Sequence, residues 1–233
     1  MRLVKMLGLA MVAALATMAF IGASSASAVT LCEELTAEEG GAECPAAKRF
    51  AVPTTLHAEL AAGTKAVLEG GGLFGNIECE ESASEGNTVA EGSTELSLMG
   101  EITKLTFGKC THGAETCTVE SEHKPYLVLV LLTGEPAPAP KWHVVVEKKG
   151  TNGRPQAKVT CPAGSCTFGK EEVLFGLLPL GTPPVDVHLS VAQELEREGG
   201  VFCPAKSTWK ATYLVKCLKP ALTRVGCFPA MKP

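Results

Sequence analysis

Two stretches of the chain alternate between apolar and polar residues with a period of two. Residues 185–192 place Val or Leu at every second position, and residues 208–215 do the same with Trp209, Ala211, Tyr213 and Val215. This alternation is typical of a β-strand with one buried face. Trp209 and Tyr213 are therefore expected to face a core.

The remaining apolar segments also favour strands. Residues 126–132 form a continuous apolar run, which indicates a strand buried on both faces, and 144–146 add another strand. Further candidate strands lie at 53–60, 64–69, 74–81, 93–98 and 101–107, separated by Gly-rich turns. Many short strands with turns about every 8 to 12 residues predict a sandwich or a related all-β fold. We predict an antiparallel β-sandwich, Ig-like or jelly-roll-like, with disulfide-closed hairpins.

The first 28 residues have the pattern of a secretory signal peptide. Arg2 and Lys5 precede an apolar run over 6–22, and small residues lead to an A-x-A site that ends at Ala28. The residue before Cys32 is Leu31, whereas a lipid-attachment site needs a small residue there. We predict a secreted protein, in the extracellular or cell-envelope space, with no membrane attachment after cleavage.

Ten cysteines follow the predicted cleavage site: Cys32, Cys44, Cys79, Cys110, Cys117, Cys161, Cys166, Cys203, Cys217 and Cys227. An even number in an exported chain predicts a framework of up to five disulfides. Spacing ranks four local pairs first, 32–44, 110–117, 161–166 and 217–227, which leaves 79–203. Zinc is the competing interpretation, but only 161 and 166 come near the usual ligand spacing.

The cysteines and the composition also divide the mature chain. Residues 29–49 are rich in Glu, Ala and Gly and are predicted to form an N-terminal appendage clipped on by the first cysteine pair, with a short helical turn as an option. Residues 50–216 form the predicted sandwich domain. Residues 217–233 form a predicted disulfide-clipped tail.

Charge and motifs exclude several function classes. Without Arg2 and Lys5 the mature chain has 19 basic and 25 acidic residues, a balance that argues against a nucleic-acid partner. Asp186 is the sole aspartate, which excludes calcium loops of the D-x-[DN]-x-[DN]-G kind. Residues 70–75 match G-x-G-x-x-G, yet a strand-like segment follows where a dinucleotide site needs a helix. We interpret this motif as a glycine turn and predict no cofactor.

Asp186 and His188 are the weak catalytic candidates. They lie two residues apart on one strand, so their side chains point the same way and could join a serine from a neighbouring strand. No G-x-S-x-G elbow accompanies them, and a solvated strand face is the favoured interpretation. His112, His123 and His143 are scattered without an H-E-x-x-H motif, so no metal site is predicted.

Paired glutamates offer a second catalytic possibility, that of a glycosidase. The chain has 25 acidic residues, and all except Asp186 are glutamates, so close carboxylate pairs are expected by chance. Trp142, Trp209, Tyr126 and Tyr213 are its only large polar aromatics, and two of them are predicted to face the core. Little surface is then left for stacking sugar rings.

Three segments carry a resemblance to a known group. Residues 100–107 with Cys110, the Cys117-Thr118-Val119 segment, and Cys203 leading to Trp209–Tyr213 resemble uncharacterised secreted β-rich proteins of high-GC actinobacteria. The resemblance covers about residues 50–215. It implies export and a β fold, and it implies no activity.

The leading functional hypothesis is a non-catalytic secreted protein that binds an extracellular or cell-envelope ligand or partner through its loops. The alternative is a secreted hydrolase acting on polysaccharide or peptide, which predicts that Asp186, His188 or two glutamates converge in one concave pocket. A third hypothesis is a small-ligand carrier, which predicts an apolar pocket without titratable groups.

Overall fold

The computed structural model describes residues 29–33, 44–70, 75–90, 97–133, 141–180, 186–219 and 224–231. The predicted signal peptide at 1–28 lies outside these residues. The elements are β1 (Val29–Cys32), the 3-10 turn η2 (Ala46–Lys48), β2 (Thr55–Leu60), β3 (Ala66–Glu69), β4 (Asn76–Ala90), β5 (Ser97–His112), β6 (Glu115–Glu122), β7 (Tyr126–Thr133), β8 (Lys141–Lys148), β9 (Gln156–Cys161), β10 (Gly164–Gly169), β11 (Glu172–Leu180), β12 (Asp186–Gly199), β13 (Lys206–Leu218), β14 (Arg224–Gly226) and β15 (Phe228–Met231). In this part of the chain, no helix has the length and hydropathy needed to cross a membrane.

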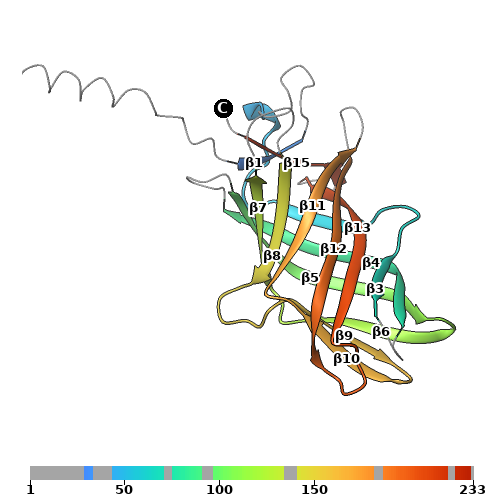
Figure 1. The fold of residues 1–233 in the computed structure, drawn as a ribbon. Coiled ribbons are helices and arrows are strands. Elements are labelled where there is room, and N and C mark those ends of the chain that lie inside the picture. Colours follow the sequence, from blue (N-terminus) through green and yellow to red (C-terminus); the bar gives the residue numbers. More distant parts are fainter. Residues whose placement is uncertain are drawn as a thin grey trace, which may run out of the picture.

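The predicted antiparallel, sandwich-like β class is confirmed, and the two layers belong to one continuous 13-stranded sheet. In Figure 1, strands β7, β8, β11, β12 and β13 form one layer, and β4 and β5 cross behind it. The layers join where β5 pairs with β7 and where β13 pairs with β2. Because β2 pairs with β4, and β4 with β5, the sheet closes on itself around an interior.

The long strands β4 and β5 bend where their pairing shifts register. Shifts occur at Glu85/Gly86 and at Thr88/Ala90, and such bulges bend a strand from one layer toward another. A Cβ on Gly86 would lie 2.1 Å from the Glu101 carbonyl oxygen, so only glycine permits this close approach. The sequence predicted separate strands at 93–98 and 101–107, whereas β5 runs through Gly100 without a turn.

The two ends of the described chain meet at one end of the sheet. β1 pairs with β15, from Val29 opposite Met231 to Cys32 opposite Phe228, and Figure 1 shows this pair over the ends of β7, β8 and β11. We call the buried group beneath it the terminal cluster: Val29, Leu31, Leu98, Cys217 and Cys227. The cluster joins residues from the predicted appendage, sandwich and tail, and β13 extends through Cys217 to Leu218. The predicted division into three parts stays a prediction.

All ten cysteines form disulfides, as predicted, but only two of the five ranked pairs are correct. Cys32–Cys44 and Cys217–Cys227 are confirmed. The other bonds are Cys79–Cys110, Cys117–Cys161 and Cys166–Cys203, so the pairs 110–117, 161–166 and 79–203 are wrong. Five disulfides favour a compartment outside the reducing cytoplasm.

Strand register explains both errors at the hairpins. The β9–β10 turn places Cys161 opposite Gly164 and Cys166 opposite Val159, so these two cysteines do not face each other. Cys110 does lie opposite Cys117, but it also lies opposite Cys79, with which it bonds. The Cys79–Cys110 bond therefore bridges the β4–β5 hairpin, the longest one, rather than the short β5–β6 hairpin.

Candidate functional site

The interior of the closed sheet holds an apolar cavity of about 170 Å³. Its walls come from both layers, because β5, β7, β12 and β13 all contribute side chains to it. Representative lining residues are Leu68, Ile77, Leu105, Phe107, Val119, Val128, Val130, Leu189, Trp209 and Tyr213. A well-formed apolar pocket is the default candidate for a binding site.

Several of the lining side chains are only half-buried although they point inward. Leu105, Val128 and Leu189 pack against the main core cluster without being fully covered. Protein interiors are normally packed to crystal-like density, so inward-facing side chains that keep exposed surface indicate empty space. The cavity is thus a property of the packing of these residues.

Trp209 belongs to a group of aromatic rings in the cavity wall. Its ring meets Phe175 edge-on with centroids 5.6 Å apart, and Phe107 and Tyr213 each lie 6.4 Å away. The sequence prediction that Trp209 and Tyr213 face the core is confirmed. Trp209 Nε1 is buried and lacks a hydrogen-bond partner among the described residues, and T-shaped aromatic neighbours offer such a group only weak N–H···π contacts.

Each of the two tyrosines in the wall forms a hydrogen bond between its hydroxyl group and a serine hydroxyl. Tyr213 Oη lies 3.0 Å from Ser82 Oγ, and Tyr126 Oη lies 2.8 Å from Ser121 Oγ. Burial raises the pKa of both phenols above the usual value, and the hydrogen bond to serine opposes this in each case. Both phenols therefore stay neutral at physiological pH and bring no charge to the cavity.

Comparisons with known proteins provide no relative. The chain matches no protein-family model, no curated protein and no solved structure. The resemblance to secreted actinobacterial proteins stays a prediction. Function has to be inferred from the cavity and from the residues around it.

A second hollow of about 360 Å³, which we call the outer hollow, lies beside the cavity at the junction of β5 and β6. It shares Leu105, Phe107 and Val119 with the cavity, so the two spaces adjoin at these three residues. Its other lining residues are mostly polar: Thr106, Glu120, Ser121, Glu122 and Lys124. The residues that border the cavity at this junction therefore also border a more polar space.

His188 is not among the described residues that line the cavity. Asp186 and His188 lie on β12, where they stand opposite Leu180 and Leu178 of β11. On its other side His188 stands opposite Leu214 of β13. These cross-strand partners are all leucines, so the neighbouring strands bring no serine to these positions.

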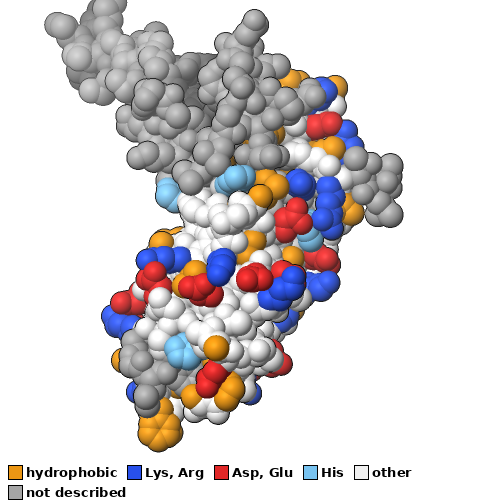
Figure 2. Space-filling model, turned by 90° about the vertical axis from the view of Figure 1, so that its right-hand side faces the viewer, with side chains coloured by type: hydrophobic (Ala, Val, Ile, Leu, Met, Phe, Trp, Pro, Cys, Tyr) orange, Lys and Arg blue, Asp and Glu red, His pale blue; other side chains and the backbone are white. Residues whose placement is uncertain are grey.

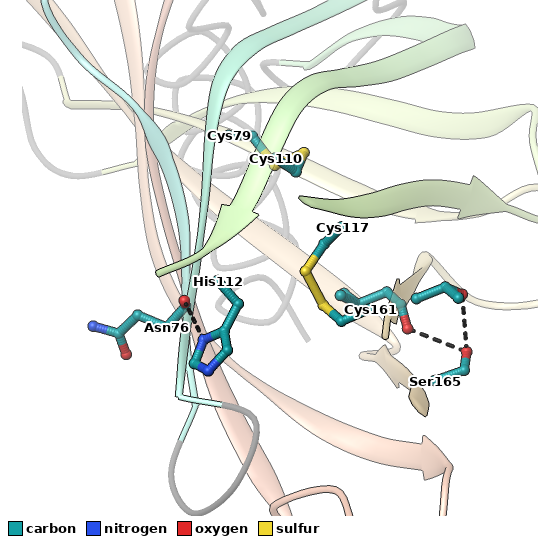
Figure 3. The surroundings of a disulfide bond; sticks show 9 residues. Asn76, Cys79, Cys110, His112, Cys117, Cys161 and Ser165 are labelled. Atoms are coloured by element: carbon teal, nitrogen blue, oxygen red, sulfur yellow. Dashed lines mark hydrogen bonds between the residues drawn. A yellow bond between two sulfur atoms is a disulfide. The ribbon is translucent and has the colours of Figure 1, made fainter. Parts of the chain in front are cut away.

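The other sequence candidates also stay apart. His112 Nδ1 donates to the Asn76 carbonyl oxygen at 3.2 Å (Figure 3), and the exposed His123 and half-buried His143 lie on other segments. In the described ranges, no three His, Cys, Asp or Glu residues are grouped closely enough to hold a metal ion. The glycine motif joins antiparallel β3 and β4, and Gly70 N donates to Gly75 O, while residues 71–74 lie outside the described residues.

Many of the glutamates form ion pairs with lysines on the outside of the sheet. Examples are Glu69 with Lys210 at 2.6 Å, Glu78 with Lys65 at 2.8 Å and Glu194 with Lys206 at 2.5 Å. Figure 2 shows positive and negative side chains interspersed on one face of the molecule. Three glutamates lie closer to the cavity. Glu101 borders the cavity and is paired with Lys149 at 2.5 Å, and Glu120 and Glu122 line the outer hollow.

The residues that sequence reasoning missed are those that surround the cavity. Leu105, Phe107 and Val119 gave no signal beyond that of ordinary strand residues. Their part in the site depends on which strands pair across the molecule, and alternation alone does not reveal that.

Proposed function

We propose that the mature protein is secreted and binds a small, uncharged, apolar molecule inside the closed sheet. The observation that carries this proposal is the apolar cavity of about 170 Å³, bordered by half-buried Leu105, Val128 and Leu189. A ligand in this space would restore the dispersion contacts that the lining side chains lack. The site deepens the carrier hypothesis drawn from the sequence.

The chemistry of the wall supports an uncharged ligand. The phenols of Tyr126 and Tyr213 are held neutral and are bonded to serines, and Glu101 pairs with Lys149. A charged ligand would have to leave water without gaining an opposite charge, which is strongly unfavourable. Apolar burial, by contrast, contributes about 25 cal/mol per Å² of surface removed from water.

The experiment compares two ligands and two variants of the mature protein, residues 29–233. Naphthalene should bind and raise the thermal unfolding temperature, whereas naphthalene-2-sulfonate, with the same ring system and a permanent charge, should not. At about 100 times its Kd, a ligand adds about 2.7 kcal/mol to the free energy of unfolding.

Val128→Phe should abolish the stabilisation by naphthalene, because the larger side chain fills the cavity. Leu174→Phe is the matched control, since Leu174 is 44% exposed on β11, and this variant should bind as the wild type does. Equal stabilisation of both variants by naphthalene would show that the ligand binds outside the cavity.

A further inference from the structure

Strand β5 has an interrupted edge on the side of the outer hollow. Along this edge it pairs with β7 over Ser97–Ile102, and with β6 only at Thr106 and from Cys110 to His112. Residues 103–105 and 107–109 have no ladder partner on this side. Lys109 adopts φ +50°, which marks a sharp local departure from strand geometry. We call this junction the β5–β6 seam.

The seam lies between the cavity and the surface. Leu105 and Phe107 of β5 and Val119 of β6 line both the cavity and the outer hollow. All three side chains are half-buried. The same three residues therefore border both spaces, at a place where the β5–β6 ladder shifts register between Thr106 and Cys110.

The disulfides strengthen the junctions on either side and leave the seam without a covalent link. Cys79, Cys110, Cys117 and Cys161 stand in one row across β4, β5, β6 and β9 (Figure 3). One bond joins β4 to β5, and the next joins β6 to β9. Cys110 and Cys117 face each other across the seam and are not bonded to one another.

We propose that the apolar ligand reaches the cavity through the β5–β6 seam, by separation of the linked β4–β5 pair from the linked β6–β9 pair. Phe107 and Val119 are the side chains that move aside. This route rests on the proposed function, because it presupposes a ligand in the cavity. Opening the seam separates a ladder of four register pairs and breaks no disulfide.

The natural row of cysteines supplies a way to lock the seam. The double variant C79S/C161S leaves Cys110 and Cys117 as the remaining thiols of the row. Residues directly opposite in an antiparallel pair have Cα atoms about 4.5 to 5.5 Å apart, which suits a disulfide. C79S/C110S is the matched control: it also keeps four disulfides but retains Cys117–Cys161 and leaves the seam unlinked.

The measurement is the association rate of 1-bromonaphthalene by stopped-flow, with quenching of tryptophan fluorescence as the signal. Each background carries Trp142→Phe, so that Trp209 is the only reporter. Mass spectrometry first confirms the Cys110–Cys117 bond in C79S/C161S. This variant should then bind 1-bromonaphthalene at least about tenfold more slowly than the control, because the seam must open for binding. An equal rate in the two variants overturns the route.

A second variant decides the matter if the new disulfide does not form. Phe107→Ala thins the barrier, so association should accelerate about fivefold or more. Leu174→Ala is its control on an exposed position. An unchanged association rate in Phe107→Ala overturns only the route. A wild-type protein that shows no binding at all overturns the proposed function as well.

Discussion

The terminal cluster and the cavity wall are built from similar apolar side chains that are packed in opposite ways. In the terminal cluster Val29 is fully buried and Leu98 is 2% exposed. Around the cavity Val128 and Leu189 face inward from the same sheet and remain half-buried. The two-stranded β1–β15 sheet covers the first group, and nothing in the described chain fills the space beside the second. Inward-facing half-burial therefore distinguishes a binding cavity from a solid core.

Matched truncations should separate the two regions most strongly. Leu98→Ala removes a fully packed side chain and should lower the free energy of unfolding by about 3 kcal/mol. Leu189→Ala removes atoms that already border empty space and make fewer contacts, so about half that loss is expected. Urea unfolding of the two variants measures the difference. Equal losses would mean that Leu189 is as tightly packed as Leu98 and would contradict a hollow interior.

The ionisation of the Tyr126 and Tyr213 phenols tests whether the cavity excludes water. The expected effect on stability is smaller than that of the truncations. Burial raises the pKa of both Tyr126 and Tyr213, and it raises the pKa of Tyr213 more than that of Tyr126. Because the folded pKa exceeds the unfolded value near 10, the stability that these neutral phenols contribute is complete below about pH 10 and is lost as the pH rises through the folded pKa.

Alkaline titration of tyrosinate absorbance should follow this order. Tyr126 is observed alone in Tyr213→Phe, and Tyr213 alone in Tyr126→Phe, because the chain has two tyrosines. Both should ionise above the pH at which the urea-unfolded chain does, and Tyr126 should ionise first. Ionisation of either phenol at the unfolded value in the folded protein would indicate a water-filled interior.

The sequence predicted the strands better than it predicted their partners. Alternation correctly assigned β12 and β13 and the inward direction of Trp209 and Tyr213, because a half-buried strand imposes a period of two on its own residues. The cavity was not predictable in the same way. It depends on closure through the β4–β5 and β13–β2 pairings, and the same alternation suits a solid core.

The cysteines show the same limit at the level of single residues. Proximity along the chain favoured 161 with 166, yet the tight turn sets Cys161 opposite Gly164. Cys117 is bonded instead to Cys161, one step beyond the pairing of Thr118 with Thr160 on the neighbouring strand. Register between strands decides such bonds, and it is fixed by packing across the sheet.

The most direct test of the cavity is an equilibrium titration of the Trp142→Phe mature protein with 1-bromonaphthalene, whose bromine quenches indole fluorescence on contact. Trp209 lines the cavity and is then the sole tryptophan. The account predicts saturable quenching with one site per chain, and the loss of that site when Val128→Phe is added. Quenching that rises linearly without saturation, or that persists unchanged with Val128→Phe, would contradict a ligand site inside the closed sheet.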